Sequence, residues 1–371
     1  MENEIKEKPN AEQDINEKLY SDDNLEVTIF KCANCGGEAV FDPSTQKMRC
    51  LYCGSYFEVD NHTIVEERDL GELLKSGSVW ENAEVYQCKS CGAKEILDGQ
   101  EISMKCPFCG TSNIVKTEEL PGLKPQGITP FKVDKKQAVN VATTWAKKKK
   151  FAPRDFKKSL KLEKIQGIYN PVFTFDALTK SSYNGTLGKH VVRYRYVNGR
   201  RESYTETRYF RINGFQDVTF DDLLVQASTA IPANIINDIQ PFPTKKALEY
   251  RTDYLRGYFA NTYNKSGQDC WNECKTVMNS SIERQILKRY DYDVKVALHV
   301  NTTFLNEQYK YVLVPIYVGH YNYKNKLYNF YINGYNGKIG GKTPVSALKV
   351  TFTVILSLLL VVGVILLFMY L

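Results

Sequence analysis

Apolar residues are most concentrated at the C-terminal end of the chain. Residues Val350–Leu371 contain no charge, and 16 of these 22 residues are Val, Ile, Leu or Phe. As an α-helix this segment would be about 33 Å long, slightly more than the hydrocarbon core of a bilayer at roughly 30 Å. Buried core helices are usually shorter and less uniformly apolar. The pattern therefore predicts one transmembrane helix over residues 350–371, and because no residue follows it, a tail anchor.

The segment before this helix indicates how the chain is oriented. Lys338, Lys342 and Lys349 precede the apolar run, and no acidic residue lies among them. Basic residues beside a transmembrane helix favour the cytoplasmic side. We therefore expect a single-pass protein of the cell membrane with residues 1–349 in the cytoplasm.

Residues 131–348 alternate between helical and extended periods, which is typical of an α+β domain with antiparallel strands. Asp134 is suited to cap a helix that continues to about Lys149, and residues 266–289 form a second helical stretch. These two segments are the helices expected in the domain.

Strands are expected on both sides of the second helical stretch. Residues 191–197 and 203–212 form a predicted hairpin through Asn198-Gly199. Residues 291–342 return to strands rich in Tyr and Val, with turns at Asn333-Gly334 and Asn336-Gly337. The runs that begin at Pro171 and Pro315 are alike, which indicates a second, weaker duplication within the domain.

The remaining segments are polar or rich in residues that break regular structure. Residues 1–29 contain nine acidic residues against three lysines, a net charge of −6. We expect a disordered acidic tail there; the alternative is a peptide that docks on a basic partner. Residues 60–85 are predicted to be a connector with a short helix near Glu66–Leu74, and residues 118–130 a linker.

Eight of the ten cysteines fall in four Cys-x-x-Cys pairs that repeat at a fixed interval. The spacing between the two pairs is the same in both copies, and every cysteine of the second copy follows its counterpart at one constant interval. This tandem repeat predicts two zinc ribbons, over residues 30–59 and 86–117. The candidate metal ligands are Cys32, Cys35, Cys50, Cys53, Cys88, Cys91, Cys106 and Cys109.

The spacing of the cysteines has a physical basis. A Cys-x-x-Cys-Gly turn directs two thiolates at one metal, and the glycine after it relieves a turn in which φ is expected to be positive. Those glycines are Gly36, Gly54, Gly92 and Gly110. Four thiolates fill every corner of the zinc tetrahedron, so we expect two structural Zn²⁺ ions rather than catalytic ones. Disulfides or redox pairs are the less favoured alternative, because a reducing compartment keeps the thiols reduced.

Charge is unevenly distributed. The chain carries +7 in total, and residues 131–164 carry twelve basic against three acidic residues, a net of +9 that includes Lys147–Lys150. A solvated helix face, contact with anionic lipid headgroups and weak binding of nucleic acid are all consistent with this region. The ribbons have nearly balanced charge before zinc is counted, which makes them poor candidates for phosphate binding.

Three signals that resemble enzyme motifs do not fit an active site. The segment Gly337–Thr343 lacks the first glycine of a phosphate loop and lies too close to the apolar run for a nucleotide-binding sheet to follow. Cys270 and Cys274 lie four residues apart on the predicted helix and are interpreted as packing residues. His320 is interpreted as a sheet or surface histidine. The protein is therefore expected not to be an enzyme.

Several motifs resemble the TFIIB-type zinc-ribbon proteins anchored in bacterial membranes, and the resemblance covers nearly the whole chain from residue 30. Many relatives are labelled primosomal or replication-restart helicases, an activity that we do not transfer because this chain has no phosphate loop or helicase core. The resemblance implies an adaptor role, and partners among flotillin-like or phage-shock-type proteins of envelope stress. The motifs are Cys32-Ala-Asn-Cys35-Gly, Phe41-Asp-Pro, Met48-Arg-Cys-Leu-Tyr-Cys53-Gly-Ser, Pro130-Phe131-x-Val-Asp, Lys150-Phe-Ala-Pro153, Ile168-Tyr-x-Pro171-Val-Phe, Tyr311-Val-Leu-Val-Pro315 and Asn333-Gly-x-x-Gly337-Lys.

The sequence thus predicts a tail-anchored scaffold that faces the cytoplasm and recruits protein partners to the membrane through its zinc ribbons. The alternative from another class is a nucleic-acid-binding protein tethered to the membrane.

Overall fold

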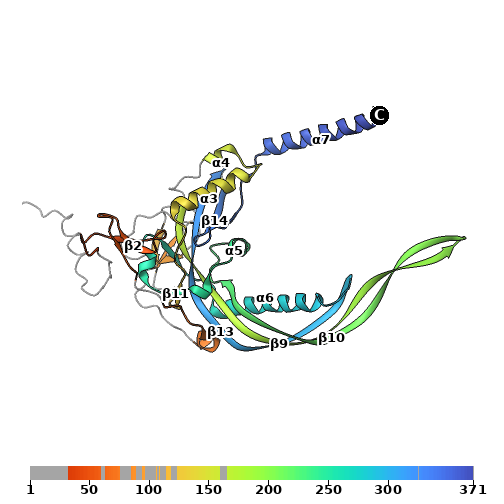
Figure 1. Cartoon of the computed structure of the whole chain (residues 1–371), viewed down its shortest axis with the longest axis horizontal. Coiled ribbons are helices and arrows are strands. Elements are labelled where there is room, and N and C mark those ends of the chain that lie inside the picture. The colour runs from red at the N-terminus through yellow and green to blue at the C-terminus, as the bar shows by residue number, and fades with distance from the viewer. Residues whose placement is uncertain are drawn as a thin grey trace, which may run out of the picture.

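In the computed structural model of the protein (Figure 1), residues 32–59, 63–75, 85–88, 94–96, 106, 108, 114–117, 123–158, 165–324 and 326–370 are described. The predicted acidic tail, residues 1–29, lies outside them. The architecture is α+β with mainly antiparallel strands, as expected, and one apolar helix at the C-terminus.

Two long strands form the centre of the main sheet. Strand β9 (Ile165–Val197) pairs antiparallel with β13 (Val294–Tyr323) along a ladder that runs from Gly188 opposite Val294 to Ile165 opposite Gly319. Strand β10 (Arg200–Gln226) folds back on β9, and β14 (Lys326–Asn333) folds back on β13. All three of the longest strands are strongly curved (Figure 1).

The main domain contains two segments in which a short strand, a helix and two further strands follow in the same order, and we call these segments the two βαββ units. The first unit is β8 (Gly127–Ile128), α3 (Lys135–Lys148), β9 and β10, and the second is β12 (Phe259–Asn261), α6 (Gly267–Leu287), β13 and β14. The interval from the start of β8 to the start of β12 equals the interval from the start of α3 to the start of α6. Strand β8 runs parallel to β13, and β12 runs parallel to β9, so each unit contributes its short strand to the other unit's long strand.

Two prolines occupy equivalent positions in the central strands. Pro171 of β9 lies opposite Leu313, and Pro315 of β13 lies opposite Tyr169. The outer edge of each strand changes partner at its proline, from β12 to β10 beside Pro171 and from β8 to β14 beside Pro315. A proline has no N–H to donate, so a break between outer strands accommodates it inside a sheet. The prolines thus mark where the short strand of one unit gives way to a hairpin.

The helices cover opposite ends of this sheet. Aromatic rings fill the space beneath α3, where Phe131 contacts Tyr258, Tyr317 and Tyr169 with centroids 4.1, 4.8 and 5.1 Å apart. Helix α6 packs on the curved face of β9, β10 and β13 through a continuous buried side made of Cys270, Trp271, Cys274, Met278, Ile282 and Ile286.

The other elements are short or terminal. They are β1 (Ala39–Asp42), β2 (Lys47–Cys50), β3 (Tyr56–Phe57), β4 (Arg68–Asp69), α2 (Leu70–Lys75), β5 (Val85–Cys88), β6 (Lys94–Ile96), β7 (Ile114–Thr117), α4 (Arg154–Lys158), α5 (Ala233–Ile239), η2 (Thr244–Lys246), β11 (Leu248–Glu249), η3 (Thr252–Leu255), β15 (Ile339–Gly341) and α7 (Ala347–Tyr370).

The predicted hairpin forms, but its strands are far longer than the sequence pattern indicated. Residues 198–199 make the expected turn, with φ of 51° at Asn198 and 77° at Gly199, and the strands on either side contain 33 and 27 residues. Residues 189–208 lie beyond Val294, the first residue of β13 that pairs with β9. In this stretch β9 and β10 form ladder pairs only with each other. We call this projecting ribbon the arm; its tip stands clear of the body (Figure 1).

The segments expected to connect domains take part in the sheet. The short helix of the first connector is present as α2, a few residues later than expected. In the segment 118–130, Gly127 and Ile128 form β8 and are buried between β13 and β11.

The helix caps provide a test of the duplicated units. The N-cap Asp134 accepts a hydrogen bond from the Gln137 N–H at 2.7 Å, and its counterpart Ser266 accepts one from the Asp269 N–H at 3.1 Å. Replacing either N-cap with Ala leaves helix N–H groups without a partner, so each should cost about 1 kcal/mol. For a domain of this size we expect the thermal midpoint of the full chain in detergent to fall by about 2–4 °C. Lys136→Ala is the control, and cap variants that unfold at the same temperature as this control would contradict the prediction.

Candidate metal centre and membrane segment

Each cysteine pair of the first ribbon lies in a tight turn closed by a glycine. The Gly36 N–H donates to the Cys32 carbonyl at 2.7 Å, and the Gly54 N–H donates to the Cys50 carbonyl at 3.1 Å. The φ angles of Gly36 and Gly54 are 69° and 73°, a conformation that residues with a Cβ rarely adopt. The expected positive φ is therefore confirmed for these two glycines, while Gly92 and Gly110 lie outside the described residues.

The hairpin of β1 and β2 brings the two turns together. All four sulfurs of Cys32, Cys35, Cys50 and Cys53 lie within 4.8 Å of one another. The Sγ atoms of Cys32 and Cys53 are 3.4 Å apart, and those of Cys35 and Cys50 are 3.5 Å apart. Four sulfurs bound 2.3 Å from one zinc would be separated by about 3.8 Å. The first four-cysteine group therefore has the geometry to hold a tetrahedral metal ion after a small outward shift of the closest pairs.

The electrostatics of the four thiols also favour a cation. Hydrogen bonds with the side chain and backbone of Ser55 lower the pKa of Cys53 to about 6, which favours the thiolate form that a metal ion requires. The Gly37 N–H lowers the pKa of Cys35, but hydrogen bonds with the other three thiols outweigh this effect and raise it to about 12. Four thiols this close cannot all be ionised without a positive charge between them. A bound metal ion supplies that charge, and its binding releases protons.

The first ribbon packs on the main domain through one face and exposes the other. Phe41 and Met48 are buried in the same core cluster as Phe131, and the Phe41 ring lies 5.0 Å from that of Tyr254. On the outer side the second knuckle presents Leu51 and Tyr52, which are 61% and 77% exposed. The Tyr52 ring is therefore available at the surface rather than used to fill the ribbon core.

The structure describes only part of the second predicted zinc ribbon, residues 86–117. Strands β5, β6 and β7 form a small antiparallel unit, and β6 joins the main sheet because Ile96 pairs with Ala260 of β12. Cys88 and Cys106 are buried in one cluster of the main core. Cys91 and Cys109 lie outside the described residues, so the second predicted metal site stays a prediction.

Helix α7 contains the predicted transmembrane segment. It runs from Ala347 to Tyr370, and none of its residues is buried against the rest of the described chain. Its length and uniformly apolar side chains are sufficient to cross a membrane. An exposed apolar surface of this extent is unfavourable in water, so a single span is the state that its composition fits.

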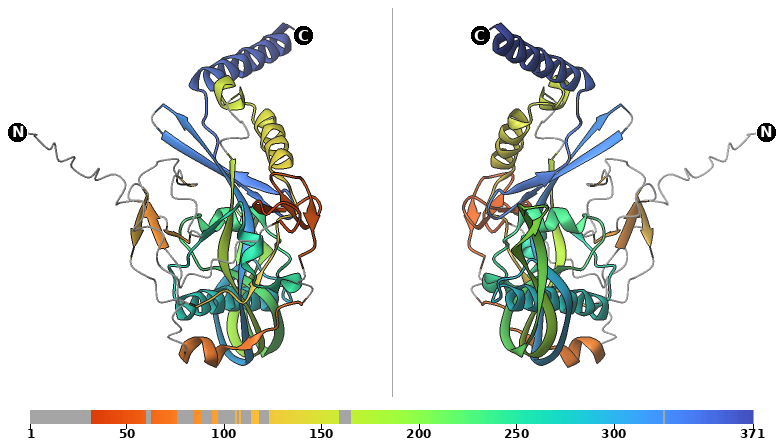
Figure 2. Two further views of the ribbon diagram at one scale, coloured as in Figure 1. Left: turned by 90° about the vertical axis from the view of Figure 1, so that its left-hand side faces the viewer. Right: turned by 90° about the vertical axis from the view of Figure 1, so that its right-hand side faces the viewer.

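The basic end of α3 lies beside the start of α7. The Ser346 N–H donates to the Phe151 carbonyl at 2.9 Å, and the Lys349 ammonium donates to the Ala152 carbonyl at 2.6 Å. Figure 2 shows α3 and α4 adjacent to the point where α7 leaves the body. A cleft of about 370 Å³ there is lined by Lys150, Phe151, Leu348, Lys349, Phe352 and Thr353. The four lysines 147–150 thus lie close to the end of the apolar helix.

The residues rejected as enzyme signals have structural roles. Burial raises the pKa of Cys270 to about 12 and raises the pKa of Cys274 even further. Both are therefore unreactive thiols on the buried face of α6. Within the segment 337–343, residues 339–341 form strand β15, which pairs with β14 and is not followed by a nucleotide-binding helix. His320 lies within β13, opposite Asn329.

Two features were missed by sequence reasoning. One is the arm, because the pattern predicted only its terminal strands. The other is a group of carboxylates from Glu67, Asp176 and Asp221, which lie in three separate segments. The adjacent acids Asp221 and Asp222 inside an otherwise apolar strand pattern are the signal that would have revealed it, because aspartate is depleted in strands.

Comparisons with known proteins identify a relative of similar length. The chain is 28% identical over 330 residues to the uncharacterized protein YdjG of Bacillus subtilis (strain 168), which covers 87% of this chain and 92% of that protein. No family model matches the chain, and no solved structure matches it. The similarity therefore covers most of both chains and brings no activity with it.

The cysteine geometry predicts the zinc content. We expect the full chain, purified under reducing conditions, to contain two Zn²⁺ ions per molecule. Cys35→Ser should remove one of them, because three thiolates and a hydroxyl hold zinc much more weakly. Elemental analysis measures this, with Cys270→Ser as a control that removes a cysteine outside the ribbons. Less than one zinc in the wild-type protein, or equal zinc in Cys35→Ser, would contradict the assignment.

The apolar helix predicts membrane attachment. Deleting residues 350–371 should move the protein from the membrane pellet to the soluble fraction, because about twenty apolar residues supply the favourable transfer energy. Replacing the same residues with an unrelated apolar helix of equal length should restore attachment. Fractionation after a high-salt wash is the measurement, and a deleted chain that stays in the pellet would refute the anchor.

Proposed function

We propose that this protein is a membrane-anchored adaptor without catalytic activity, which holds protein partners at the cytoplasmic face of the cell membrane. The observation that carries the proposal is the combination of an apolar terminal helix with a long projecting arm. In this proposal the two ribbons each hold a structural zinc ion, and the first uses its exposed knuckle as a second contact surface. The flotillin-like and phage-shock-type proteins implied by the family resemblance are the partners that we would test first.

The two faces of the arm differ in chemistry. On one face Arg193 pairs with Glu206 at 3.1 Å and Arg195 pairs with Glu202 at 3.7 Å, so these charges are partly satisfied within the arm. The other face carries an exposed row that we call the aromatic stripe. It consists of Val192, Tyr194, Tyr196 and Arg201.

The aromatic stripe has the composition of a protein-binding surface. Val192 and Tyr194 are 57% exposed and Tyr196 is 77% exposed. The Arg201 guanidinium lies 3.8 Å from the centre of the Tyr194 ring, which holds both side chains in place. Tyrosine and arginine contribute most of the binding energy in many protein interfaces, and side chains that are already ordered lose little entropy on binding. A partner with an apolar patch and an acidic rim would complement this face.

The lysines beside α7 support attachment to an anionic membrane surface. Lys150 and Lys349 line the cleft at the start of α7, and Lys147–Lys149 directly precede Lys150 in the chain. This end of α7 lies in the headgroup region if the helix spans the bilayer. Each such cation contributes about 1 kcal/mol near an anionic surface. We therefore assign the basic region 131–164 to anionic lipid in preference to a freely solvated face, and this basic flank also favours a cytoplasmic body.

A nucleic-acid-binding protein tethered to the membrane is the second candidate. The arm carries six basic residues against two acidic ones, and its tyrosines alternate with arginines. Such a ribbon suits phosphate contact and base stacking. Binding of this kind would be independent of sequence, with a dissociation constant of about 10⁻⁴–10⁻⁶ M that weakens steeply with salt.

The molecule that binds the arm distinguishes the adaptor from the nucleic-acid-binding protein. A photo-crosslinking amino acid at position 196 should form adducts with a membrane-associated protein in cells, and Tyr194→Ser with Tyr196→Ser should weaken binding to that protein at least tenfold. The same probe at position 209, which is 62% exposed but outside the arm, is the matched control. Adducts formed mainly with RNA or DNA would support the second candidate. No adduct above the level at position 209 would reject the arm as a docking surface.

A further inference from the structure

Four carboxylates from distant parts of the chain meet at one point of the main sheet. Glu67 lies just before β4, Asp176 lies in β9, and Asp221 and Asp222 lie in β10. One carboxylate oxygen from each of Glu67, Asp176 and Asp221 lies within 4.8 Å of the others. Oxygen atoms bound 2.3–2.6 Å from one cation are separated by no more than about 5 Å. The spacing of these three groups is therefore that of ligands around a single ion.

Irregularities in two strands create this arrangement. The register of β10 shifts between Phe220 and Leu223, opposite Asp176, and Asp222 has a φ of 53°. The register of β13 shifts at the same level, between Leu305 and Gln308. The bulge in β10 places two consecutive acids beside β9, where regular pairing would direct them to opposite faces.

The basic residues at this point do not balance the acidic ones. The Lys310 ammonium lies 3.0 Å from an oxygen of Glu67 and 2.9 Å from Oδ1 of Asp222, and Lys245 pairs with Asp221. Four carboxylates against two ammonium groups leave a net charge of −2 when all are ionised. A divalent cation would neutralise this charge.

Asp222 provides an independent indication of a ligand. Its side chain is only 5% exposed, and its Oδ2 atom is buried without a hydrogen-bond partner. A buried carboxylate oxygen with no partner is costly unless a cation or a proton satisfies it.

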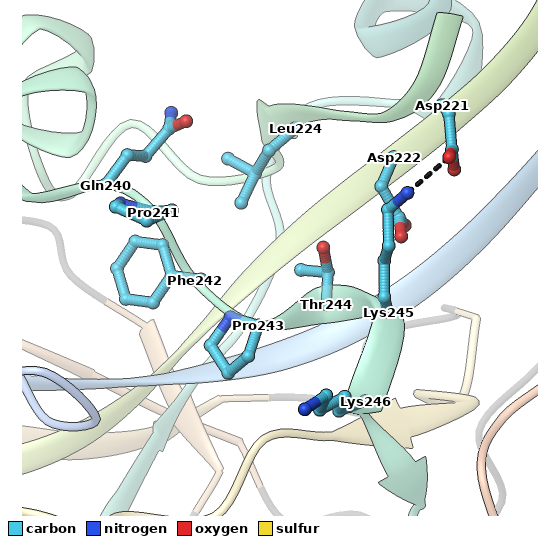
Figure 3. Close-up of a pocket in the computed structure, with 10 residues that line it drawn as sticks. All are labelled: Asp221, Asp222, Leu224, Gln240, Pro241, Phe242, Pro243, Thr244, Lys245 and Lys246. Carbon is cyan, nitrogen blue, oxygen red and sulfur yellow. Dashed lines mark hydrogen bonds and ion pairs between the residues drawn. The ribbon is translucent and has the colours of Figure 1, made fainter.

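A cleft gives solvent access to the side of the cluster formed by Asp221 and Asp222. Figure 3 shows Asp221 and Asp222 on one wall and Lys245 on η2 facing them, with Gln240–Pro243 forming the far side. The cleft has a volume of about 310 Å³. Water molecules in it would complete the coordination of an ion held by carboxylates on one side.

We propose that Glu67, Asp176 and Asp221, with the buried Asp222 beside them, bind one hard divalent cation, Mg²⁺ or Ca²⁺. These residues offer only oxygen ligands, which suit Mg²⁺ and Ca²⁺ better than they suit Zn²⁺, an ion that favours cysteine and histidine. Because two ammonium groups compete with the ion, its affinity is moderate, with a dissociation constant on the order of 10⁻⁴ M.

The test uses the full chain, loaded with zinc, in a nonionic detergent with about 0.1 M KCl to screen weak surface binding. Mn²⁺ is the probe, because it shares the preference of Mg²⁺ for carboxylates, and the electron paramagnetic resonance signal of free Mn²⁺ reports binding. We expect one site per chain from which Mg²⁺ or Ca²⁺ displaces Mn²⁺. Glu67→Gln and Asp221→Asn should each weaken binding at least tenfold. Both side chains are partly exposed, so the variants should fold, as circular dichroism would verify.

Two controls make the outcome decisive. Asp217→Asn removes an exposed acid from the same strand and should leave the affinity unchanged. Lys245→Gln removes a competing ammonium group and should tighten binding severalfold, an effect that loss of structure cannot imitate. The proposal is overturned if the wild-type chain binds less than one Mn²⁺ at millimolar concentration, if neither Mg²⁺ nor Ca²⁺ displaces it, or if both carboxylate variants bind as the wild type does.

Discussion

The antiparallel pairing of β9 with β13 is the interaction on which the rest of the structure depends. It joins the two βαββ units along their longest strands and fixes where every outer strand lies. The outer edge of each long strand is divided between a short parallel strand and a long antiparallel one, and the division falls at a proline. If either strand slipped by one residue, its proline would no longer lie at the break between the outer strands, and the buried face of that strand would turn outward. Hydrogen bonding and burial therefore enforce the same register.

The parts of the fold that are held by local hydrogen bonds could be predicted from the sequence. The cap of α3, the turn at Asn198-Gly199 and the two cysteine knuckles of the first ribbon each form within a few residues. Their signals are short motifs with a direct structural reason, such as a side chain that reaches the third N–H of a helix. The candidate ligands could be predicted from the fixed interval between the cysteine pairs, because the geometry of one metal ion determines that spacing.

The features that the sequence did not reveal depend on pairing between distant segments. The length of β9 follows from its partners on both edges, so the polar alternation near the arm contains no signal for where the sheet ends. Lys310 is flanked by Tyr309 and Tyr311 and is buried because Glu67 and Asp222 reach it from two other segments of the chain. Neither contact can be inferred from neighbouring residues, since the bulge that turns Asp222 toward the cluster is itself a product of the register between β9 and β10.

The same long-range pairing gives the adaptor proposal its mechanical basis. A partner held by the arm is held by β9 and β10, and these strands run back through the carboxylate cluster into the centre of the sheet. Mutual repulsion among Glu67, Asp176, Asp221 and Asp222 favours separation of β10 from β9 and of β4 from the sheet, whereas a bound cation favours their contact. An ion at this point would therefore stiffen the part of the sheet from which the arm extends. The arm's two strands enter the main sheet at Gly188 and Tyr209, and the carboxylate cluster lies further along the same strands, at Asp176 of β9 and Asp221 of β10. The cluster therefore lies between the docking surface and the end of the sheet nearest the membrane helix.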